Sequence, residues 1–316
     1  MHSDAGDGYL FVHHVEDPDG HGEQVFFSLS LGDDPLSWRR LNGGRPVLEP
    51  TLGTTGVRDP FVVRGDGEFF VVATDLRIYG DGEPTPERWD GWKRHGSRSI
   101  VVWRSTDLVR WSEPWLLEVA PPQAGMAWAP EATFDAATGE FTLLWSSALH
   151  ERADHRDDSY SRVLTARTRD FRAVSAPEVL IDRGRAVIDT TVARCGDAWL
   201  RFSKDDSRSP GSLRLFAEVD TGDGFTVVAE RIADELYADV EAPVVVHDVR
   251  RDRWVLFVDQ FSVRPQGYLP LVSDDPLSGV WTPVPAGGFS IPANTKHGGV
   301  LALTAQERER LSVAFG

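Results

Sequence analysis

Four acidic residues and one histidine stand at the heads of apolar, strand-like runs: Asp59 before PFV, Glu131 before ATF, Asp189 before TTV, Glu241 before APV and His297 before GGV. A carboxylate buried without partners costs several kcal/mol, so we expect these side chains to face an opening. Carboxylates that face each other across a small pocket have their pKa values driven apart by repulsion and desolvation. One can then act as a general base while another holds a proton and acts as a general acid. Glycoside hydrolysis uses such a pair, and a separation of about 6.5–9.5 Å admits the water that inverts the sugar.

These five anchors recur at intervals of roughly fifty to seventy residues, and each begins a similar succession of short strands. The last unit is split between GGVLALT near the C-terminus and GYLFVHHV, EQVFFSLS and DPLSWRRLN near the N-terminus. Four-stranded repeats of about fifty residues are typical of propellers. We therefore predict an all-β chain, a single five-bladed β-propeller over residues 1–316, closed by N- and C-terminal strands that share one blade. A two-sheet sandwich is the alternative, but it leaves the anchors unexplained.

The propeller geometry predicts where these side chains meet. The first residue of each innermost strand and the loop between the second and third strands of each blade lie at the same face of the ring. We therefore expect the anchors to converge with the polar loops 15–23, 77–98, 150–161, 205–211 and 262–267. A binding pocket is expected there, over the axis. The only helix that the sequence predicts is the tail, TAQERERLSVAF.

Eleven tryptophans are present, and position separates their expected roles. Trp128 heads an inner strand and is the candidate platform for a sugar ring, while Trp89 and Trp92, in the longest mouth loop, are candidates for a pocket wall. The tryptophans near the blade ends are expected to pack between blades: Trp38, Trp103, Trp111 and Trp281.

Several of these residues also have a purely structural interpretation. Axial polar residues can simply hold water or an ion, and Glu131, directly after Trp-Ala-Pro, can serve only to orient a neighbour. His297 could bind a metal, a water or a sugar hydroxyl, although one imidazole is a weak metal signal. With oxygen ligands around it, the expected ion is a structural calcium at the axis. The single cysteine, Cys195, lies in a turn away from the mouth, and we do not expect it to act as a nucleophile.

Composition excludes several classes of partner. The formal charge is −16 and no Lys/Arg-rich run is present, so we expect no nucleic-acid binding. No apolar run approaches 18 residues, so we expect no membrane-spanning helix. The N-terminus does not have the pattern of a signal peptide, which favours a cytoplasmic protein unless a signal was removed. A neutral glycoside or oligosaccharide is compatible with this surface.

The motifs RDPFVV, WAPEATFD, VIDTTV and DVEAPVVV, in this order, together with KHGGV, resemble the blade motifs of glycoside hydrolase family 43. The resemblance covers nearly the whole chain. It implies a five-bladed, inverting hydrolase whose chemistry needs no cofactor, often with a structural calcium at the axis. It also implies roles for three residues: Asp59 as the catalytic base, Asp189 as the residue that tunes the acid and orients the substrate, and Glu241 as the general acid. This chain has EAP where many members have EGP, and IDTT where IDP is common.

The expected function is therefore an exo-acting, inverting glycosidase, with an α-L-arabinofuranoside as the first substrate. The long 77–98 loop should block one side of the funnel. A β-D-xyloside or a β-D-galactofuranoside or galactoside is the alternative substrate. Substrate contacts are expected from Arg58, Phe61, Trp92, Trp128, Glu131 and His297. Two other functions stay open: a glycoside phosphorylase, with Arg58, Arg77 and Arg98 around a phosphate, and a sugar-binding propeller without catalysis.

Overall fold

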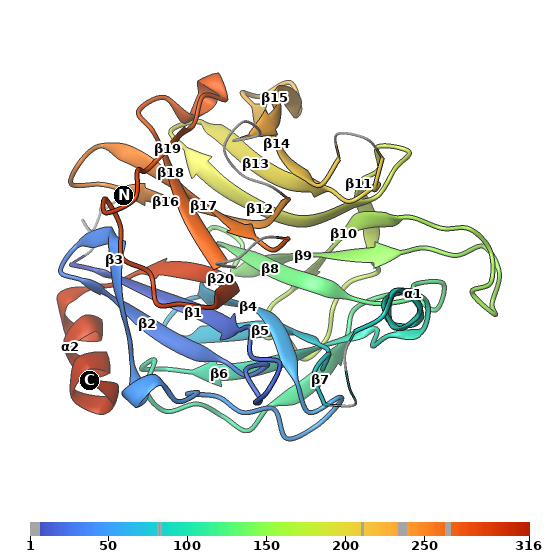
Figure 1. Ribbon diagram of the computed structural model, residues 1–316, viewed down its shortest axis with the longest axis horizontal. Helices are drawn as coiled ribbons and strands as arrows, with labels where there is room; N and C mark the ends of the chain where they lie inside the picture. The colour runs from blue at the N-terminus through green and yellow to red at the C-terminus, as the bar shows by residue number, and fades with distance from the viewer. Residues whose placement is uncertain (1–6, 81, 83, 210–211, 233–238, 263–266) are drawn as a thin grey trace.

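Five four-stranded antiparallel sheets surround a common axis and confirm the predicted five-bladed propeller (Figure 1). The computed structural model describes residues 7–80, 82, 84–209, 212–232, 239–262 and 267–316. In each blade the first strand is innermost, and the five inner strands contact their neighbours around the axis. The predicted mouth loops 205–211 and 262–267 lie partly outside the described residues.

The strands follow one another outward within each blade. Blade 1 contains β20 (Thr295–Ala302), β1 (Tyr9–Val15), β2 (Phe26–Leu31) and β3 (Asp34–Arg40). Blade 2 contains β4 (Val57–Arg64), β5 (Phe69–Asp75), β6 (Ser99–Ser105) and β7 (Trp115–Glu118). Blade 3 contains β8 (Trp128–Asp135), β9 (Glu140–Ala148), β10 (Ser161–Thr168) and β11 (Glu178–Ile181). Blade 4 contains β12 (Val187–Cys195), β13 (Ala198–Asp205), β14 (Arg214–Asp220) and β15 (Thr226–Ile232). Blade 5 contains β16 (Val240–Asp248), β17 (Arg253–Gln260), β18 (Gly267–Ser273) and β19 (Thr282–Pro283).

Blade 1 closes the ring because β1 pairs with β20 on one side and with β2 on the other. The C-terminal strand is therefore innermost, and the N-terminal strands lie outside it, as the split repeat predicted. Closure in this way completes the fifth four-stranded blade from the two ends of the chain.

Hydrophobic side chains fill the spaces between neighbouring blades, and four tryptophans lie there as predicted. Trp103 is buried, and Trp111 half-buried, in the core between blades 1 and 2. Trp38 packs against Phe257 between blades 1 and 5. Trp281 packs edge-on against Phe202 between blades 4 and 5. Each large side chain buried in this way stabilises the ring by about 2 kcal/mol.

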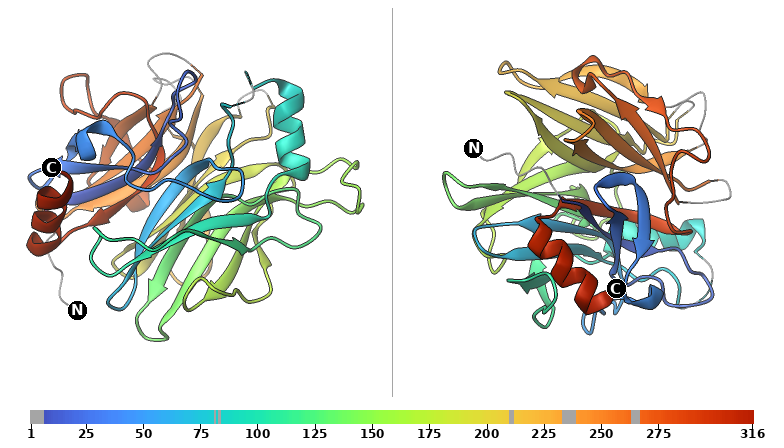
Figure 2. Two further views of the ribbon diagram at one scale, coloured as in Figure 1. Left: turned by 90° about the horizontal axis from the view of Figure 1, so that it is seen from below. Right: turned by 90° about the vertical axis from the view of Figure 1, so that its left-hand side faces the viewer.

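The predicted C-terminal helix is present as α2 (Ala305–Phe315), at the periphery of the ring (Figure 2). Thr304 and Glu307 form a reciprocal capping box at its start, and Arg64 at the end of β4 forms an ion pair with Glu307. Leu311 and Phe315 pack into the core between blades 1 and 2. The helix thereby ties the end of the chain to blade 2. No helix in the described ranges is long and apolar enough to cross a membrane.

Loss of this cap should be measurable as a loss of stability. Thr304→Ala removes the hydroxyl that accepts from the amide of Glu307, and we expect it to lower the free energy of unfolding by about 1 kcal/mol. Urea denaturation measures the change. Gln306→Ala, an exposed position on the same first turn, is the matched control and should change stability by less than about 0.5 kcal/mol. Equal effects of the two substitutions would contradict a stabilising role for the cap.

A second helix, α1 (Pro86–His95), lies in the segment that we expected to be a polar loop. Thr85 caps it, Pro86 occupies its first turn, and Lys93, Arg94 and His95 complement the dipole at its end. These signals are visible in the sequence, but the helix has no buried face, so hydrophobic periodicity did not show it. Figure 2 shows α1 standing on one face of the ring. Two short 3-10 turns, Asn42–Gly44 and Pro276–Ser278, complete the regular structure of the described residues.

Candidate active site

A pocket of about 490 Å³ opens where the inner strands begin, and it gathers side chains from all five blades. Asp59 of β4, Asp189 of β12, Glu241 of β16 and His297 of β20 line it together. We expected five anchors to converge here, and four of them do, whereas the fifth, Glu131, does not line the pocket. The separation of the base and acid carboxyls stays a prediction.

The predicted alignment of the anchors was wrong in one respect. Each inner strand carries a β-bulge at the mouth, and the acidic residues occupy different positions of it. Asp59 and Asp189 are the first residues inside their bulges, Glu241 is the last paired residue before its bulge, and Glu131 is the residue at which pairing resumes. Bulges re-aim side chains beside active sites, so one sequence repeat can deliver carboxylates at several angles.

The first residue inside the bulge has a left-handed backbone in four blades, at Asp59, Ala129, Asp189 and Ala242, where φ is 52°, 49°, 52° and 54°. This conformation is unusual for residues other than glycine, and Asp tolerates it better than most. Backbone strain of this kind persists where the surroundings impose it, commonly at functional sites. The bulge also brings blades together, because Oδ2 of Asp189 accepts from the amide of Ala242, next to Glu241, at 3.2 Å.

Asp59 is held in its ionised form. Its Oδ2 accepts a hydrogen bond from the Thr74 hydroxyl at 2.7 Å, and its Oδ1 lies 3.2 Å from Nδ1 of His297. Burial alone would raise the pKa of Asp59, but His297, with His14 and Arg58, holds this pKa well below its usual range. Burial opposes a charged His297, yet its contact with Asp59 raises the pKa of His297 to about 9. Asp59 is therefore an oriented carboxylate anion at neutral pH.

Asp189 and Glu241 hold their protons unequally. Burial raises the pKa of Asp189 to about 7, and the charge of Glu241 adds to this shift while His297 and Lys204 oppose it. Burial also acts to raise the pKa of Glu241, but Lys204, whose Nζ lies 2.7 Å from its Oε2, and Lys296 lower that pKa below its usual value. We expected Asp189 to keep Glu241 protonated. In this structure the proton is instead held more strongly by Asp189.

Glu131 is buried and is not among the residues that line the pocket. Burial raises its pKa to about 8, a shift that His297 and a hydrogen bond with Thr191 reduce and Asp189 increases. Glu131 therefore affects the pKa values of Asp189 and His297 without itself lining the pocket. This position favours the interpretation that Glu131 orients its neighbours over direct contact with a substrate.

Arg58 lines the pocket between two acidic partners. Its guanidinium lies 3.5 Å from Glu16 and 3.2 Å from Glu23. Burial acts to lower the pKa of Arg58, but these carboxylates and Asp59 raise it, so the side chain is a permanent cation. It joins the start of β4 to the mouth loop of blade 1.

The phosphate cradle that we considered is not assembled. Arg77 and Arg98 are not among the residues that line the pocket. Arg98 forms an ion pair with Glu118, and Arg77 donates to the carbonyl of Tyr79. Arg58 is engaged by two carboxylates, so the three arginines do not converge on one anion.

Trp128 and Trp89 form the aromatic wall of the pocket, with ring centroids 6.1 Å apart. The segment 77–98 contributes Trp89 and Lys93 to this wall, as expected of a loop that closes one side. Trp92 does not line the pocket; it stands behind Trp89 at 5.1 Å, with the guanidinium of Arg88 over its ring.

Phe61 does not line the pocket either. It packs against the core between blades 2 and 3, close to the inner strand of blade 1 at Gly299. A residue two positions after Asp59 follows the bulge and continues the ladder below the mouth. The expected substrate contacts of Phe61 and Trp92 are thus not supported by their positions.

An axial calcium stays a prediction, and the described residues do not favour it. Among them, no three His, Cys, Asp or Glu side chains are placed to hold a metal ion together. His297 has its Nδ1 engaged by Asp59, and its raised pKa leaves it protonated at neutral pH, without a lone pair for a metal. Cys195 lies at the end of β12, distant in the strand from Asp189 at its mouth end.

Sequence reasoning missed the cations that surround the carboxylates. Lys204, at the end of β13, forms ion pairs with Glu241 and Asp206. Lys93 of α1 binds Asp206 at 2.7 Å. Lys296 is buried against Asp259 at 2.7 Å and lines the pocket.

A positional signal for some of these residues does exist. The second strand of each blade ends at the mouth, so its last residues face the anchors. Thr74 binds Asp59 and Lys204 binds Glu241 for this reason. The SKDD run that ends the second strand of blade 4 could therefore have been assigned to the pocket.

Comparison with known proteins gives the family. The model of the glycosyl hydrolase 43-related family, described as a probable glycosyl hydrolase domain, matches residues 4–309. The chain belongs to this family. The resemblance noted from the blade motifs is thereby confirmed. An alpha-L-arabinofuranosidase of Bifidobacterium longum subsp. longum is 31% identical over 216 residues, which are 63% of this chain. They are 20% of that protein, so the chain spans about a fifth of the length of this relative.

Solved structures of the same fold are similar to this family member at low sequence identity. A thermostable family-43 glycoside hydrolase superposes with a TM-score of 0.55 at 16% identity, over 79% of this chain and 80% of the other. The catalytic domain of the GH62 alpha-L-arabinofuranosidase of Coprinopsis cinerea gives a TM-score of 0.54 at 17% identity, over 80% and 76%. These likenesses establish the five-bladed fold.

Proposed function

We propose that this family member is an exo-acting, inverting glycoside hydrolase, and that Asp59, Asp189 and Glu241 are its catalytic residues. One observation carries the proposal: three carboxylates from three blades line one pocket, and they have different protonation. A sugar-binding propeller without catalysis has no need for this combination.

In the proposed mechanism Asp59 is the general base. It is already ionised, and Thr74 and His297 fix the directions of its two oxygens. It takes a proton from a water, the water oxygen bonds to the anomeric carbon, and the bond from that carbon to the leaving oxygen breaks. Attack from the face opposite the leaving group inverts the configuration.

Glu241 is the proposed general acid, and it gives its proton to the leaving oxygen. Lys204 and Lys296 lower the pKa of Glu241 and so favour its anion, while burial raises the pKa of Asp189 beside it. Asp189 and Glu241 titrate as a pair, so catalysis requires that the pair holds one proton, whichever of the two carboxyls carries it before the substrate binds. A sugar that displaces water from the pocket increases the cost of a charge on Glu241 and so favours its protonated form.

The proposed substrate is an α-L-arabinofuranoside, supported by the relative from Bifidobacterium longum that carries this activity in its name. Basic and acidic side chains line the pocket in similar numbers, although the whole chain carries a charge of −16. Such a balanced site suits a neutral sugar. A β-D-xyloside or a β-D-galactofuranoside remains the alternative.

A panel of nitrophenyl glycosides tests the proposal. We expect release of nitrophenol from the α-L-arabinofuranoside, no dependence on added phosphate, and an inverted anomer as the first product by NMR. Turnover only with phosphate would show a phosphorylase. Binding of the sugars without cleavage of any of them would show a non-catalytic propeller.

The shared proton predicts a pH dependence. Since the pKa of Asp189 is raised to about 7, the pair loses its proton as pH rises through this region, and kcat/KM should fall there. Lys204 lowers the pKa of both carboxyls, so Lys204→Met should move this alkaline limb upward by about one unit or more. Lys204→Arg keeps the charge and is the matched control. An alkaline limb that stays in place in Lys204→Met would contradict the role given to Lys204.

A further inference from the structure

A second pocket of about 410 Å³ adjoins the active-site pocket, and the two share Lys93, Asp206, Arg208 and Ser209 in their walls. The ion pair between Lys93 of α1 and Asp206 after β13 stands at this boundary. Blades 3 and 4 and helix α1 supply the remaining walls. None of the expected catalytic carboxylates lines the second pocket. It is therefore a separate compartment that opens beside the reaction site.

The position of the second pocket associates it with the proposed acid. Asp206 lies in the wall of both pockets and binds Lys204 at 3.3 Å, and Lys204 binds Glu241 at 2.7 Å. Asp59, the proposed base, has its described contacts with Thr74, His14 and His297 instead. In an inverting hydrolysis the leaving group departs on the side of the acid. A chain that leaves past Glu241 would cross the Lys93–Asp206 boundary into this compartment.

The walls of the second pocket suit a hydroxylated ligand. Four serines and one tyrosine lie in them, and among the lining residues only Ala148, Ala186 and Gly184 carry no polar side-chain atom. Most basic residues of the wall are already paired, as Arg94 is with Asp90 and Arg185 with Asp205. The chemistry of this lining therefore matches sugar hydroxyls better than an apolar or strongly anionic group.

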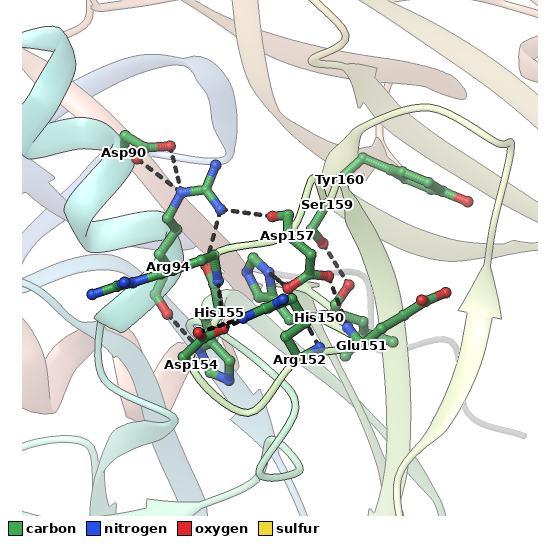
Figure 3. A network of polar contacts seen from close by, with 12 residues as sticks. Asp90, Arg94, His150, Glu151, Arg152, Asp154, His155, Asp157, Ser159 and Tyr160 are labelled. Atoms are coloured by element: carbon green, nitrogen blue, oxygen red, sulfur yellow. Dashed lines mark hydrogen bonds and ion pairs between the residues drawn. The ribbon is translucent and has the colours of Figure 1, made fainter.

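Hydrogen bonds and an ion pair hold the wall of the second pocket at the end of α1 in place. Arg94 of α1 pairs with Asp90 and donates to the carbonyls of His155 and Asp157 at 3.0 and 2.8 Å (Figure 3). The carboxylate of Asp157 in turn accepts from the amide of Glu151 at 2.8 Å. The figure shows the Arg94 side chain between Asp90 of the helix and the loop of blade 3. A wall fixed in this way needs little ordering when a ligand binds, which favours affinity.

From these observations we propose that the second pocket is the subsite for the leaving group: it binds the hydroxylated sugar unit of the glycan from which the terminal sugar is removed. The inference rests on the proposed hydrolase function and adds a location for the second half of the substrate. Arg208 is exposed at the junction of the two pockets, with no ion pair recorded among the described residues, and can donate to the hydroxyls of that unit.

Ala186→Trp tests the subsite by filling it. Ala186 lines the second pocket and not the first, and it is half-buried. The substrates are methyl α-L-arabinofuranoside, whose leaving group is methanol and is too small to fill the second pocket, and an α-L-arabinofuranosyl-substituted xylotriose. We expect Ala186→Trp to lower kcat/KM on the oligosaccharide by at least about tenfold, equivalent to about 1.4 kcal/mol, and to leave kcat/KM on the methyl glycoside within about twofold. Ala136→Trp, exposed in the turn at the opposite face, is the matched control and should change neither rate.

Arg208→Gln is the second variant and removes the donor without adding bulk. It should raise KM for the oligosaccharide several-fold, and by a larger factor than KM for methyl α-L-arabinofuranoside, because Arg208 also lines the active-site pocket. Unchanged oligosaccharide rates in a folded Ala186→Trp, or equal losses on both substrates, would overturn the subsite. Wild-type protein that cleaves neither substrate would instead overturn the hydrolase function itself, so the two failures are distinguishable.

Discussion

Asp59→Ala is expected to reduce kcat/KM by about 10²–10⁴-fold on every substrate, whatever the leaving group. A water must lose a proton during the attack, and Asp59 is the carboxylate in the pocket whose pKa lies well below its usual range. The loss should be the same on aryl glycosides and on oligosaccharides, since the base acts on the water and not on the bond that breaks.

Asp59→Asn refines this test because it keeps the size of the side chain. The amide can still meet the Thr74 hydroxyl, but the negative charge that raises the pKa of His297 is lost. His297 should then lose its proton at a lower pH than in the wild type, which NMR titration of its ring can follow. Asp66→Asn, exposed in the turn at the other end of blade 2, is the matched control and should be fully active. Retained turnover in a folded Asp59→Asn would remove Asp59 from the role of base.

Much of the architecture could be predicted because a propeller repeats its sequence pattern. The anchors marked five inner strands, and the split last unit indicated closure by the two ends of the chain. Asp59, Asp189, Glu241 and His297 were placed in one pocket by this pattern, and the structure gathers them there.

Register and bulges set the limit of that prediction. Glu131 and Glu241 look equivalent in sequence, yet Glu241 is the last paired residue before its bulge and Glu131 the first paired residue after its own, so Glu131 is buried outside the pocket lining and Glu241 lines the pocket. Phe61 was expected at the pocket because it follows Asp59 closely, but the ladder resumes at this residue and its ring enters the core. The spacing of hydrophobic residues does not specify at which residue a β-bulge interrupts the pairing of two strands.

The pKa values of the carboxyls were the other property that the sequence did not determine. Lys204 is far from Glu241 along the chain, and the ion pair exists because the end of β13 and the start of β16 meet at the mouth. This contact reverses the expected order of the pKa values of Asp189 and Glu241. A carboxylate ring can be predicted from composition and spacing, whereas the location of its proton requires the neighbours that the fold supplies.

Glu241→Ala should show an effect that depends on the leaving group. A general acid matters in proportion to the basicity of the oxygen that departs. Nitrophenolate leaves readily without a proton, so we expect a loss of about tenfold or less on the aryl arabinofuranoside. A sugar alkoxide is a poor leaving group, and on the substituted xylotriose the loss should be about 10²–10⁴-fold.

The ratio of the two losses therefore separates the acid from the base. Asp59→Ala should give a ratio near one, and Glu241→Ala a ratio far above one, in proteins shown to be folded by their melting temperature. Glu113→Ala, exposed in the segment between β6 and β7, controls for the loss of a carboxylate elsewhere and should leave both rates unchanged. The subsite variant Ala186→Trp also lowers oligosaccharide turnover, but it keeps Glu241 and hence the alkaline limb of the pH profile. Equal losses on both substrates in Glu241→Ala would assign Glu241 to a role other than protonating the leaving oxygen.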